Sequence, residues 1–459
     1  MRIKIVSFII LSLFSSFHVA KLYAQQPNII FILCDDLGYG DLGVTGHPYI
    51  KSPNIDRIAQ EGLRIENAYM SAAWCAPSRA ALMSGLYPAR YFNKTKELAV
   101  DKPSLTSILK EVGYTTAHYG KWHMGGKKAP APSPADYAID ESFIANGHSG
   151  DHPTWDKTEL KDPHWREKTT ERYVDLTIEF IKKNQSKPFF INLWVYPTHS
   201  YIDPTPEMLE VYKDLKVDIN DFKNPLQREF LQWISEQGDV QEAMRAYCSD
   251  VTELDNHVGR VMQTLVELEL DQNTMIIFSS DNGPAPLGGA RNDHVKRMET
   301  RPTLINCVGS SGPFRDRKIS LNEGGTRVPF FVRWPAKIKP GSINHETVFG
   351  GIDLLPTLAA LANASIPNGF DGKDLSAVWL GSNDQRPGSL FWNDRPGWST
   401  LRYQQWKAHL QKKEFRLYDL SKDPSESNNV ADKFPEIADG FKKQIVNWEN
   451  SLPLTKKAN

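Results

Sequence analysis

Runs of consecutive apolar residues alternate along the chain with longer segments in which apolar residues recur every three or four positions. Short apolar runs are typical of strands buried on both faces, and the longer period is typical of helices. Strands are predicted at residues 28–34, 114–120, 187–196, 273–280 and 328–334. Helices are predicted at residues 53–61, 104–112, 171–184 and about 241–269. This alternation predicts an α/β fold with a mainly parallel central sheet flanked by helices.

The pattern changes after a helix predicted at residues 354–362. Shorter strand-like segments follow at residues 388–394, 407–411 and 415–420, before a final helix. Short strands followed by a helix are typical of a small α+β unit. We therefore predict one large α/β domain over residues 25–368 and a C-terminal subdomain, with a small antiparallel sheet and a terminal helix, over residues 369–459.

The first 24 residues predict export. Arg2 and Lys4 precede an apolar run from Ile5 to Val19, and Ala24 is a small residue suited to cleavage. The run is shorter than the roughly 20 residues that a membrane-spanning helix needs. We therefore predict a signal peptide over residues 1–24, no membrane span, and a periplasmic or secreted mature protein.

Charge and cysteine content exclude several function classes. The 54 basic and 55 acidic side chains leave a net charge of −1, which argues against nucleic acid as a partner. The four cysteines include no CxxC pair, so neither a disulfide scaffold nor a zinc site is indicated. Cys34 and Cys248 lie within a predicted strand and helix and suit core packing, although a Cys248–Cys307 bridge stays open.

Two predicted strands end in acidic or amide side chains. Asp35 and Asp36 follow the first strand, and Asp281 and Asn282 follow the strand at residues 273–280. In doubly wound sheets the ligand crevice lies at the carboxyl ends of the strands, so these four side chains are expected to meet. A single aspartate after a strand more often only starts a loop. Two strand ends that both carry such oxygen-bearing side chains, however, predict an oxygen-rich site for Ca²⁺ or Mg²⁺.

Cationic and imidazole groups follow other strands. Lys121 and His123 come directly after the strand at residues 114–120, and His199 follows the strand at residues 187–196. Lys318 precedes a Gly-Gly turn and the strand at residues 328–334, and Arg315 or Arg317 could take its place. Such groups beside an acidic metal cluster suit an anionic substrate and general acid–base chemistry.

The segment Cys75-Ala-Pro-Ser-Arg79 places a thiol just ahead of a predicted helix. Pro77 suits the first turn, so Cys75 would lie beside free backbone N–H groups, with Arg79 one turn further along. A thiolate nucleophile is one interpretation. Sulfur is however a soft ligand, whereas the predicted metal site is a hard-cation site, and the residues alone leave this mismatch open.

These motifs resemble those of the sulfatase family of the formylglycine-dependent type, which has an alkaline-phosphatase-like fold. Residues 75–79 match the family pattern C-x-P-S-R, and residues 113–125 resemble its second signature. The segments EGGTRVP, LLPTL and LYDLSKDPSESNNVA resemble further family landmarks. The resemblance extends from Asn28 to about Ala431, and five matches in order make it specific.

The resemblance implies a sulfuric ester hydrolase in which Cys75 is oxidised to formylglycine by a dedicated maturation enzyme. Its hydrated aldehyde would then provide oxygen rather than sulfur, both to one Ca²⁺ and to the sulfur of a sulfate ester. The implied metal ligands are Asp35, Asp36, residue 75, Asp281 and Asn282. The implied catalytic groups are Arg79, which holds the nucleophile; Lys121 and Lys318, which bind sulfate; His199, the general acid; and His123, which helps to regenerate the aldehyde.

The substrate is not encoded in these motifs. Twelve tryptophans, together with export, favour a sulfated polysaccharide or oligosaccharide, either algal, such as ulvan or carrageenan, or a glycosaminoglycan. Packing inside the subdomain explains each tryptophan at least as well. Two other functions stay open: a phosphonate monoester or phosphodiester hydrolase of the same fold, and a non-catalytic glycan-binding homologue.

Overall fold

The computed structural model of the chain describes residues 26–91, 98, 100, 102–124, 132–145, 168–199, 202, 204–285, 308–395 and 397–453. The predicted signal peptide and Cys307 lie outside the described residues. Among the described residues, no helix combines the length and the apolar composition needed to cross a bilayer.

The main sheet has eight strands in the order β5-β4-β6-β1-β7-β8-β2-β9. Their bounds are β1 (Asn28–Cys34), β2 (Leu63–Ile65), β4 (Thr115–Lys121), β5 (Glu141–Ala145), β6 (Phe189–Trp194), β7 (Thr274–Ser280), β8 (Phe330–Arg333) and β9 (Ser342–Asn344). The first five strands in spatial order are parallel, whereas β8 runs antiparallel to both β7 and β2. A separate pair joins β3 (Ala68–Tyr69) to β10 (Phe349–Gly350). The predicted mainly parallel sheet is confirmed.

The central position of strand β1 explains why all of its residues after Asn28 are apolar. All seven of its residues are buried. Ile30, Ile32 and Cys34 belong to the hydrophobic core on one face of the sheet. Ile29, Phe31 and Leu33, which alternate with them, belong to the core on the other face. A central strand covered on both sides needs an apolar residue at each position.

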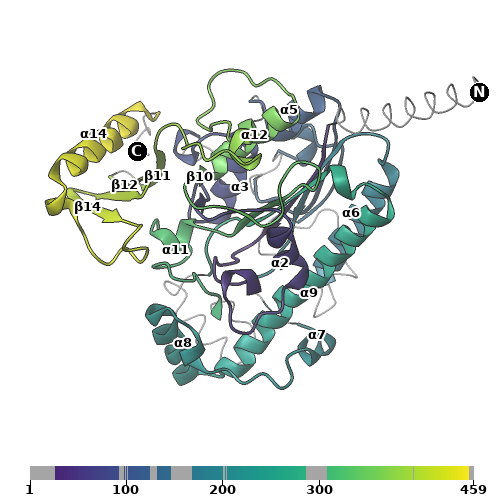
Figure 1. The fold of residues 1–459 in the computed structure, drawn as a ribbon, viewed down its shortest axis with the longest axis horizontal. Helices are drawn as coiled ribbons and strands as arrows, with labels where there is room; N and C mark the ends of the chain where they lie inside the picture. The colour runs from purple at the N-terminus through teal and green to yellow at the C-terminus, as the bar shows by residue number, and fades with distance from the viewer. Residues whose placement is uncertain are drawn as a thin grey trace, which may run out of the picture.

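Helices form a layer on each face of this sheet (Figure 1). The first core includes residues of α2 (Pro53–Gln60), α6 (Lys168–Lys183) and α9 (Val240–Glu267). The second includes residues of α3 (Cys75–Ser84), α5 (Leu105–Glu111), α12 (Leu354–Leu361) and α13 (Ser376–Trp379). Further helices are α7 (Pro206–Glu210), α8 (Pro225–Gln237) and α11 (Glu323–Thr326). Short 3₁₀ helices lie at Gly43–Thr45, Pro88–Arg90, Pro134–Tyr137, Ile219–Asp221, Asp271–Asn273, Gly351–Asp353 and Ala431–Lys433.

The C-terminal unit is an antiparallel sheet covered by one helix. Its strands are β11 (Leu390–Arg395), β12 (Trp398–Tyr403), β13 (Trp406–Gln411) and β14 (Glu414–Asp419), paired in chain order, and its helix is α14 (Pro435–Ser451). Leu401, Leu417, Phe441 and Ile445 share a core between sheet and helix. The predicted small sheet and terminal helix are present. The unit lies at the side of the main domain next to α11 and β10 (Figure 1).

Several details differ from the expectations. The predicted strands do not include β12 or the shorter strands β2, β3, β5, β9 and β10. In β12, the buried Thr400 and Arg402 interrupt the apolar pattern. Cys75 is the first residue of α3 and Trp74 is its N-cap, so the thiol lies in the helix rather than ahead of it. Cys248 is a buried free thiol in the described part of the chain, and Cys307, its suggested partner, lies outside the described residues.

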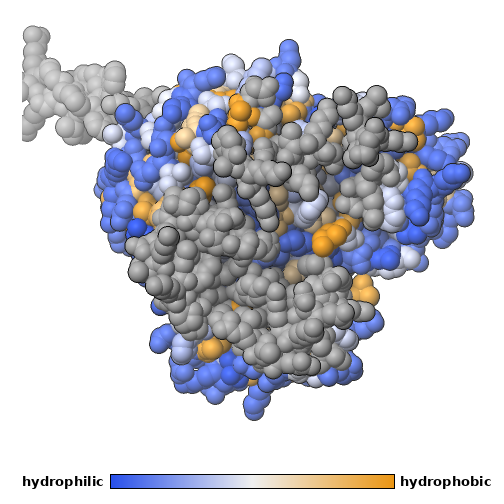
Figure 2. Space-filling view, turned by 180° about the vertical axis from the view of Figure 1, so that it is seen from behind, coloured by the Kyte–Doolittle hydropathy of each residue, from blue (hydrophilic) through white to orange (hydrophobic). Residues whose placement is uncertain are grey.

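On the face shown in Figure 2, the described residues are mostly hydrophilic, and the hydrophobic ones are scattered rather than gathered into one large patch. The chain has 54 basic and 55 acidic side chains, and charged side chains are mostly exposed, which accounts for this hydrophilic face.

Candidate active site

The carboxyl ends of four neighbouring parallel strands meet at one edge of the main sheet. Asp35 and Asp36 follow β1, Asp281 and Asn282 follow β7, Lys121 ends β4, and His199 follows β6. Backbone hydrogen bonds fix the loops to one another: Asp35 N donates to Pro197 O at 3.0 Å, and Asp281 N donates to Cys34 O at 3.1 Å. The topology therefore brings together residues that lie more than 240 positions apart, as in the 3.2 Å hydrogen bond from Asp36 N to Asp281 Oδ1.

Cys75 enters this cluster from the first turn of α3. Its thiol lies 3.2 Å from Asp35 Oδ1, and Lys318 Nζ lies 3.1 Å from Cys75 Sγ. Burial, together with the charges of Asp281 and Asp35, raises the pKa of the Cys75 thiol well above its usual value. An unmodified Cys75 would remain a protonated thiol, which is a poor nucleophile.

Arg79 lies under the cluster and ties two strands together. Its guanidinium donates to Asp281 Oδ2 from Nε at 2.9 Å and contacts the same oxygen from Nη2 at 2.7 Å, while Nη1 donates to the backbone oxygen of Lys121 at 3.0 Å. Arg79 and Asp281 are fully buried. A rigid guanidinium with several donors suits this bridging position.

Two lysines reach the cluster, Lys121 from the end of β4 and Lys318 from the segment before α11. Lys121 Nζ donates to Asp35 Oδ2 at 2.5 Å, and Lys318 Nζ donates to Asp36 Oδ1 at 2.6 Å. Burial alone would raise the pKa of Asp35, but Lys121, His199 and Arg79 together hold it well below its usual range. The carboxylate therefore stays ionised under physiological conditions.

The contacts of the two neighbouring arginines show which basic side chain of this loop faces the cluster. Arg317 donates to the backbone oxygen of Ala285 at 2.7 Å and to Gln227 Oε1 at 3.1 Å. Arg315 donates to the backbone oxygen of Glu426 at 3.0 Å. In the structure it is Lys318, rather than either arginine, that faces Asp36 and Cys75.

The two predicted histidines are placed differently. His199 Nε2 lies 3.7 Å from Asp36 Oδ2, and the ring is buried. His123 follows β4 by two residues and is half-buried, and its φ of 55° lies in the left-handed region.

The donor set fits a hard cation. Ligand atoms of Asp35, Asp36, Cys75 and His199 lie within 4.8 Å of one another. Asn282 Nδ2 donates to Asp36 Oδ1 at 2.7 Å, which directs the amide, while Asn282 Oδ1 is buried and has no hydrogen-bond donor among the described residues. A buried carbonyl oxygen without a donor beside carboxylates is suited to Ca²⁺ or Mg²⁺. Asp281 is less open, because Arg79 and Asp36 N already contact its two oxygens.

Asp41 and Tyr247 support the site, although the sequence gives little sign of them. Asp41 is fully buried and accepts hydrogen bonds from Gly38 N at 2.7 Å, Ser310 N at 2.6 Å and Tyr247 OH at 2.6 Å. Tyr247 OH also lies 3.0 Å from Thr198 Oγ1, next to His199. The only sequence signal is a third aspartate six residues after Asp35, which is easily read as a turn residue.

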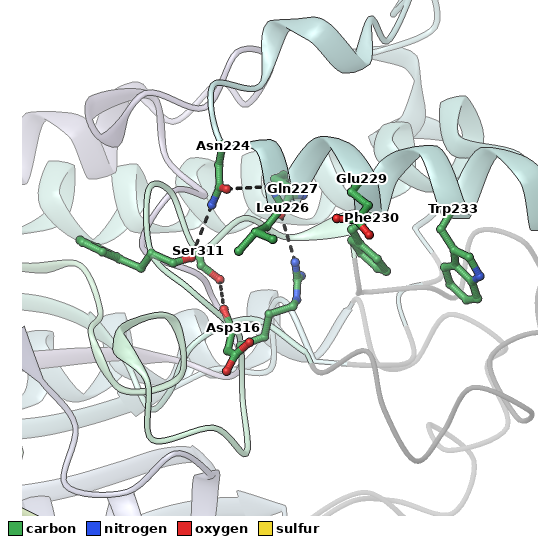
Figure 3. Close-up of a pocket in the computed structure, with 10 residues that line it drawn as sticks. Asn224, Leu226, Gln227, Glu229, Phe230, Trp233, Ser311 and Asp316 are labelled. Atoms are coloured by element: carbon green, nitrogen blue, oxygen red, sulfur yellow. Dashed lines mark hydrogen bonds between the residues drawn. The ribbon is translucent and has the colours of Figure 1, made fainter. Parts of the chain in front are cut away.

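A separate pocket lies beside the Lys318 loop. It has a volume of about 280 Å³ and is lined by α8 and residues 311–317. Figure 3 shows Phe230 and Trp233 projecting from α8, and their rings stack 6.0 Å apart. The Ser311 hydroxyl points toward Asp316 (Figure 3) and donates to its backbone oxygen at 2.7 Å. The polar groups here mostly bond to one another, which indicates a structural region rather than a catalytic one.

A model of the sulfatase family matches residues 27–364. The chain belongs to the sulfatase family. It is a type I sulfatase with the alkaline-phosphatase-like fold, and its activity class is sulfuric ester hydrolysis. A second model, of the C-terminal region of N-sulphoglucosamine sulphohydrolases, matches residues 309–451.

Individual relatives of this sulfatase are similar over most of their length. An N-acetylgalactosamine-6-O-sulfatase of Bacteroides thetaiotaomicron is 28% identical, covering 90% of this chain and 91% of the relative. An N-acetylgalactosamine-6-sulfatase of Canis lupus familiaris is 31% identical, covering 84% and 72%. A solved sulfatase from glycosaminoglycan metabolism in Bacteroides thetaiotaomicron superposes with a TM-score of 0.73 at 26% identity, covering 93% of this chain and all of that one.

Proposed function

We propose that this sulfatase hydrolyses sulfate esters on the sugar rings of a sulfated glycan. The observation that carries the proposal is the convergence of Cys75, Lys121 and Lys318 on Asp35 and Asp36, with Lys318 Nζ 3.1 Å from Cys75 Sγ. A sulfate group placed above residue 75 would lie between two ammonium groups, which are the compact charges that bind an oxyanion.

Residue 75 acts as formylglycine in this proposal. This group supplies a hydroxyl oxygen as the nucleophile in place of sulfur, which removes the mismatch between a soft thiol and a hard-cation site. Cys75 is only 3% exposed in the folded chain. The maturation enzyme is therefore expected to act before folding buries this residue.

The surrounding side chains divide the remaining work. Lys121 and Lys318 hold the sulfate oxygens and offset their charge. His199 donates a proton to the leaving oxygen of the sugar as the S–O bond breaks, and His123 accepts a proton when sulfate is released. Arg79 keeps Asp281 and the end of β4 in register, so that the nucleophile and the lysines stay aligned.

A divalent cation, Ca²⁺ in this proposal, would be held by Asp35, Asp36, Asp281, Asn282 and residue 75. When bound, it would lower the pKa of a coordinated hydroxyl. The buried Asn282 Oδ1, which has no donor among the described residues, supports this assignment.

Among sulfated glycans we favour a glycosaminoglycan that carries 6-O-sulfated N-acetylgalactosamine. The support is that two relatives over most of this chain have N-acetylgalactosamine 6-sulfatase names. Algal galactans and ulvan are the competing substrates. Action on such polymers agrees with the proposed export to the periplasm or the medium.

The test is sulfate release by protein co-expressed with a formylglycine-generating enzyme. Chondroitin 6-sulfate oligosaccharides, carrageenan and ulvan are incubated with the enzyme and with its Cys75→Ala variant in Ca²⁺, sulfate is measured by ion chromatography, and product positions are assigned by NMR. We expect release from the chondroitin oligosaccharides by the wild type only. Turnover of phosphonate monoesters or phosphodiesters without sulfate release would contradict the proposal, as would glycan binding without turnover.

A further inference from the structure

A polar pocket lies between the main domain and the C-terminal unit. Its volume is about 570 Å³. On the main-domain side it is lined by residues that directly follow β2 and β9, and on the other side by the turn between β12 and β13 and by the segment after β14. None of the residues assigned to the candidate active site lines this pocket.

Two arginines form the inner wall of the pocket. Arg402 of β12 is only 2% exposed, and Arg327, the C-cap residue of α11, has 11% of its side chain exposed. Their guanidinium carbons lie 5.5 Å and 5.8 Å from the centre of the Tyr69 ring. Both cations are therefore held against one aromatic ring.

Arg402 has no acidic partner. Its Nε donates to Tyr69 OH at 2.9 Å, and its Nη1 donates to the backbone oxygen of Trp406 at 3.4 Å. Among the described residues, no carboxylate forms an ion pair with Arg402 and none accepts a hydrogen bond from its Nη2. A buried charge is usually paired, because burial without a partner is strongly destabilising. An unpaired guanidinium on the wall of a pocket therefore favours an anionic ligand.

The buried acidic groups of this region are already paired with other cations. Glu323 Oε1 accepts from Lys407 Nζ at 2.9 Å, and Glu323 Oε2 accepts from Arg327 Nη1 at 3.0 Å. Glu426 Oε2 accepts from Glu323 N at 2.6 Å, and its Oε1 lies 3.6 Å from Lys407 Nζ. Arg402 is then a third cation beside two carboxylates, so one positive charge is left in excess.

Two further acidic side chains line the pocket, and neither of them neutralises Arg402. Glu66 accepts from Arg64 Nη2 at 2.7 Å with one oxygen and from Tyr39 OH with the other, so both of its oxygens are occupied. Glu346 is exposed, and solvent and salt screen an exposed charge. The inner wall of the pocket therefore stays positive.

We infer that this pocket is a binding site for an oxyanion, a sulfate or a carboxylate group, held by Arg402 and Arg327. Nη2 of Arg327, like that of Arg402, donates to none of the described residues, so each guanidinium has a donor available. Guanidinium groups match the geometry of oxyanions and bind them through strong charge-assisted hydrogen bonds.

The oxyanion has two possible sources. One is inorganic sulfate, which sulfuric ester hydrolysis releases. The other is an anionic group carried on a saccharide. The pocket volume lies within the roughly 300–1,000 Å³ of pockets that enclose whole small molecules, and the exposed amides of Gln385, Gln404 and Gln405 line it. These amides suit sugar hydroxyls, whereas the arginines suit either source.

The position of the anion is tested with selenate, a sulfate analogue that anomalous scattering locates in a crystal. Crystals of the wild type and of Arg402→Met are soaked in selenate. In the wild type we expect a peak within hydrogen-bond distance of Nη2 of Arg402 and of Arg327, and in Arg402→Met we expect none there. A selenate that binds beside Lys318 but not beside these arginines would overturn the inference.

Isothermal titration measures binding in solution and distinguishes the two sources. Sodium sulfate, sodium glucuronate and glucose are compared, because glucose has the ring of glucuronate without its carboxylate. Arg402→Met should weaken glucuronate binding about tenfold, since it removes charge-assisted hydrogen bonds, and glucose should bind at least tenfold more weakly than glucuronate. Arg402-dependent binding that is tighter for glucuronate than for sulfate identifies a saccharide as the source, and the reverse order identifies inorganic sulfate.

Two further variants control for charge and folding. Arg416→Met removes the same charge from the C-terminal unit, but Arg416 pairs with Glu414 outside the pocket, so glucuronate binding should change less than twofold. Glu346→Gln removes an exposed negative charge from the pocket lining and should strengthen binding about twofold. It decides the question if Arg402→Met does not fold, as judged by circular dichroism.

Three results would contradict the anion site. They are glucose binding as tight as glucuronate binding, equal losses in Arg402→Met and Arg416→Met, and a Glu346→Gln variant that binds no better than the wild type. Selenate in the crystal without Arg402-dependent binding in solution would show an adventitious ion only. None of these measurements depends on conversion of Cys75, so they test the site separately from the proposed function.

Discussion

Two buried clusters of charged residues can be compared within this chain. One is the candidate active site around Asp35 and Asp36. The other, which we call the interface cluster, joins the main domain to the C-terminal unit and consists of Glu323, Lys407, Glu426, His409 and Arg402 with Tyr69 and Arg327. Lys407, Glu323 and Glu426 have fully buried side chains, as do Asp35, Lys121 and Arg79 in the active site. The two clusters are equally removed from water.

The carboxylates of the interface cluster are closed off by partners within it. Lys407 Nζ lies 2.9 Å from Glu323 Oε1, while Tyr69 OH donates to Glu323 Oε2 at 2.9 Å. His409 lies 2.8 Å from Glu426 Oε1, and Glu323 N donates to Glu426 Oε2 at 2.6 Å. Every carboxylate oxygen has a partner, which is the condition under which buried charges are tolerated.

The active site is not closed in this way. Asn282 Oδ1 has no donor in the described part of the chain. Asp36 has a φ of 66°, in the left-handed region that non-glycine residues seldom adopt. Asp36 also accepts from Lys318, one of the two groups proposed to bind sulfate. The difference indicates that the carboxylates of one cluster are satisfied as they stand, and it agrees with the proposal that the other binds a cation and an anion.

Changing the nucleophile should have the largest effect and should affect only the active site. For Cys75→Ala we expect the rate of sulfate release to fall by on the order of 10³-fold or more, because residue 75 forms the new bond. The midpoint of urea unfolding should move little, since no carboxylate loses a cation. Residual activity above a few per cent, in protein freed of wild type, would contradict the proposed mechanism.

Removal of the metal should cause the second-largest loss of activity. After dialysis against a chelator, sulfate release should fall by on the order of 10²-fold and return with Ca²⁺, because the ion is proposed to activate the nucleophile. Because Ca²⁺ would bind only the folded state, a Ca²⁺ concentration of 100 times Kd should raise the free energy of unfolding by about 2.7 kcal/mol, which thermal unfolding would detect. Asn282→Leu should abolish this stabilisation. A wild type that Ca²⁺ does not stabilise would show that the cluster holds no such ion.

Breaking the interface cluster should affect stability rather than chemistry. Lys407→Met leaves Glu323 and Glu426 buried without their shared cation, so we expect a loss of about 3–5 kcal/mol in the free energy of unfolding, measured with urea. The matched control is Lys183→Met, because the Lys183–Glu141 pair is largely exposed. It should change stability by less than about 1 kcal/mol. Similar losses in both variants would contradict the comparison.

The pH dependence of the interface cluster should give the smallest effect. Burial alone would raise the pKa of Glu323, but Lys407, Arg327 and Arg402 lower it from 4.5 to about 2. Because the folded pKa is the lower one, the unfolded chain takes up the proton first as pH falls. Glu323 therefore contributes about 3 kcal/mol above pH 5, and this is lost between about pH 4.5 and pH 2.

Urea unfolding of the wild type and Glu323→Gln at pH 6 and pH 3 tests this expectation. The difference in unfolding free energy between the two proteins should be smaller at pH 3. A difference that does not change with pH would mean that Glu323 is not held ionised by its neighbours.

Much of the fold follows from local sequence. The apolar run of β1 and the amphipathic pattern of α9 are visible because a central strand and a packed helix need apolar residues at fixed intervals. Strand β12 is not visible in this way. Its Arg402 is buried by pairing with Tyr69 at 2.9 Å, a contact between residues 333 positions apart.

The residues of the candidate site likewise fall into two groups, those that the local sequence predicts and those that it does not. Asp35, Lys121 and His199 are predictable because they are polar residues at or shortly after the ends of buried strands, and Cys75 is predictable because it lies in a recognisable motif. Asp41 and Tyr247 are not, since their hydrogen bond joins residues 206 positions apart and neither belongs to a distinctive pattern. A pocket of about 170 Å³ beside Trp74 is lined by five separate segments of the chain (residues 71–77, 87–89, 319–321, 391–393 and 448), so its existence could not be predicted from any one of them.

The sequence by itself determined the order of the central strands and of the helices between them, the family, and the residue types that end the central strands. These depend on short-range periodicity and on local motifs. Only the tertiary structure decided which strands are neighbours, that Lys318 rather than Arg315 or Arg317 faces Cys75, and that the C-terminal unit closes a pocket beside Trp74. These depend on contacts between distant segments, and such contacts form only when both faces of the sheet and both domains are packed.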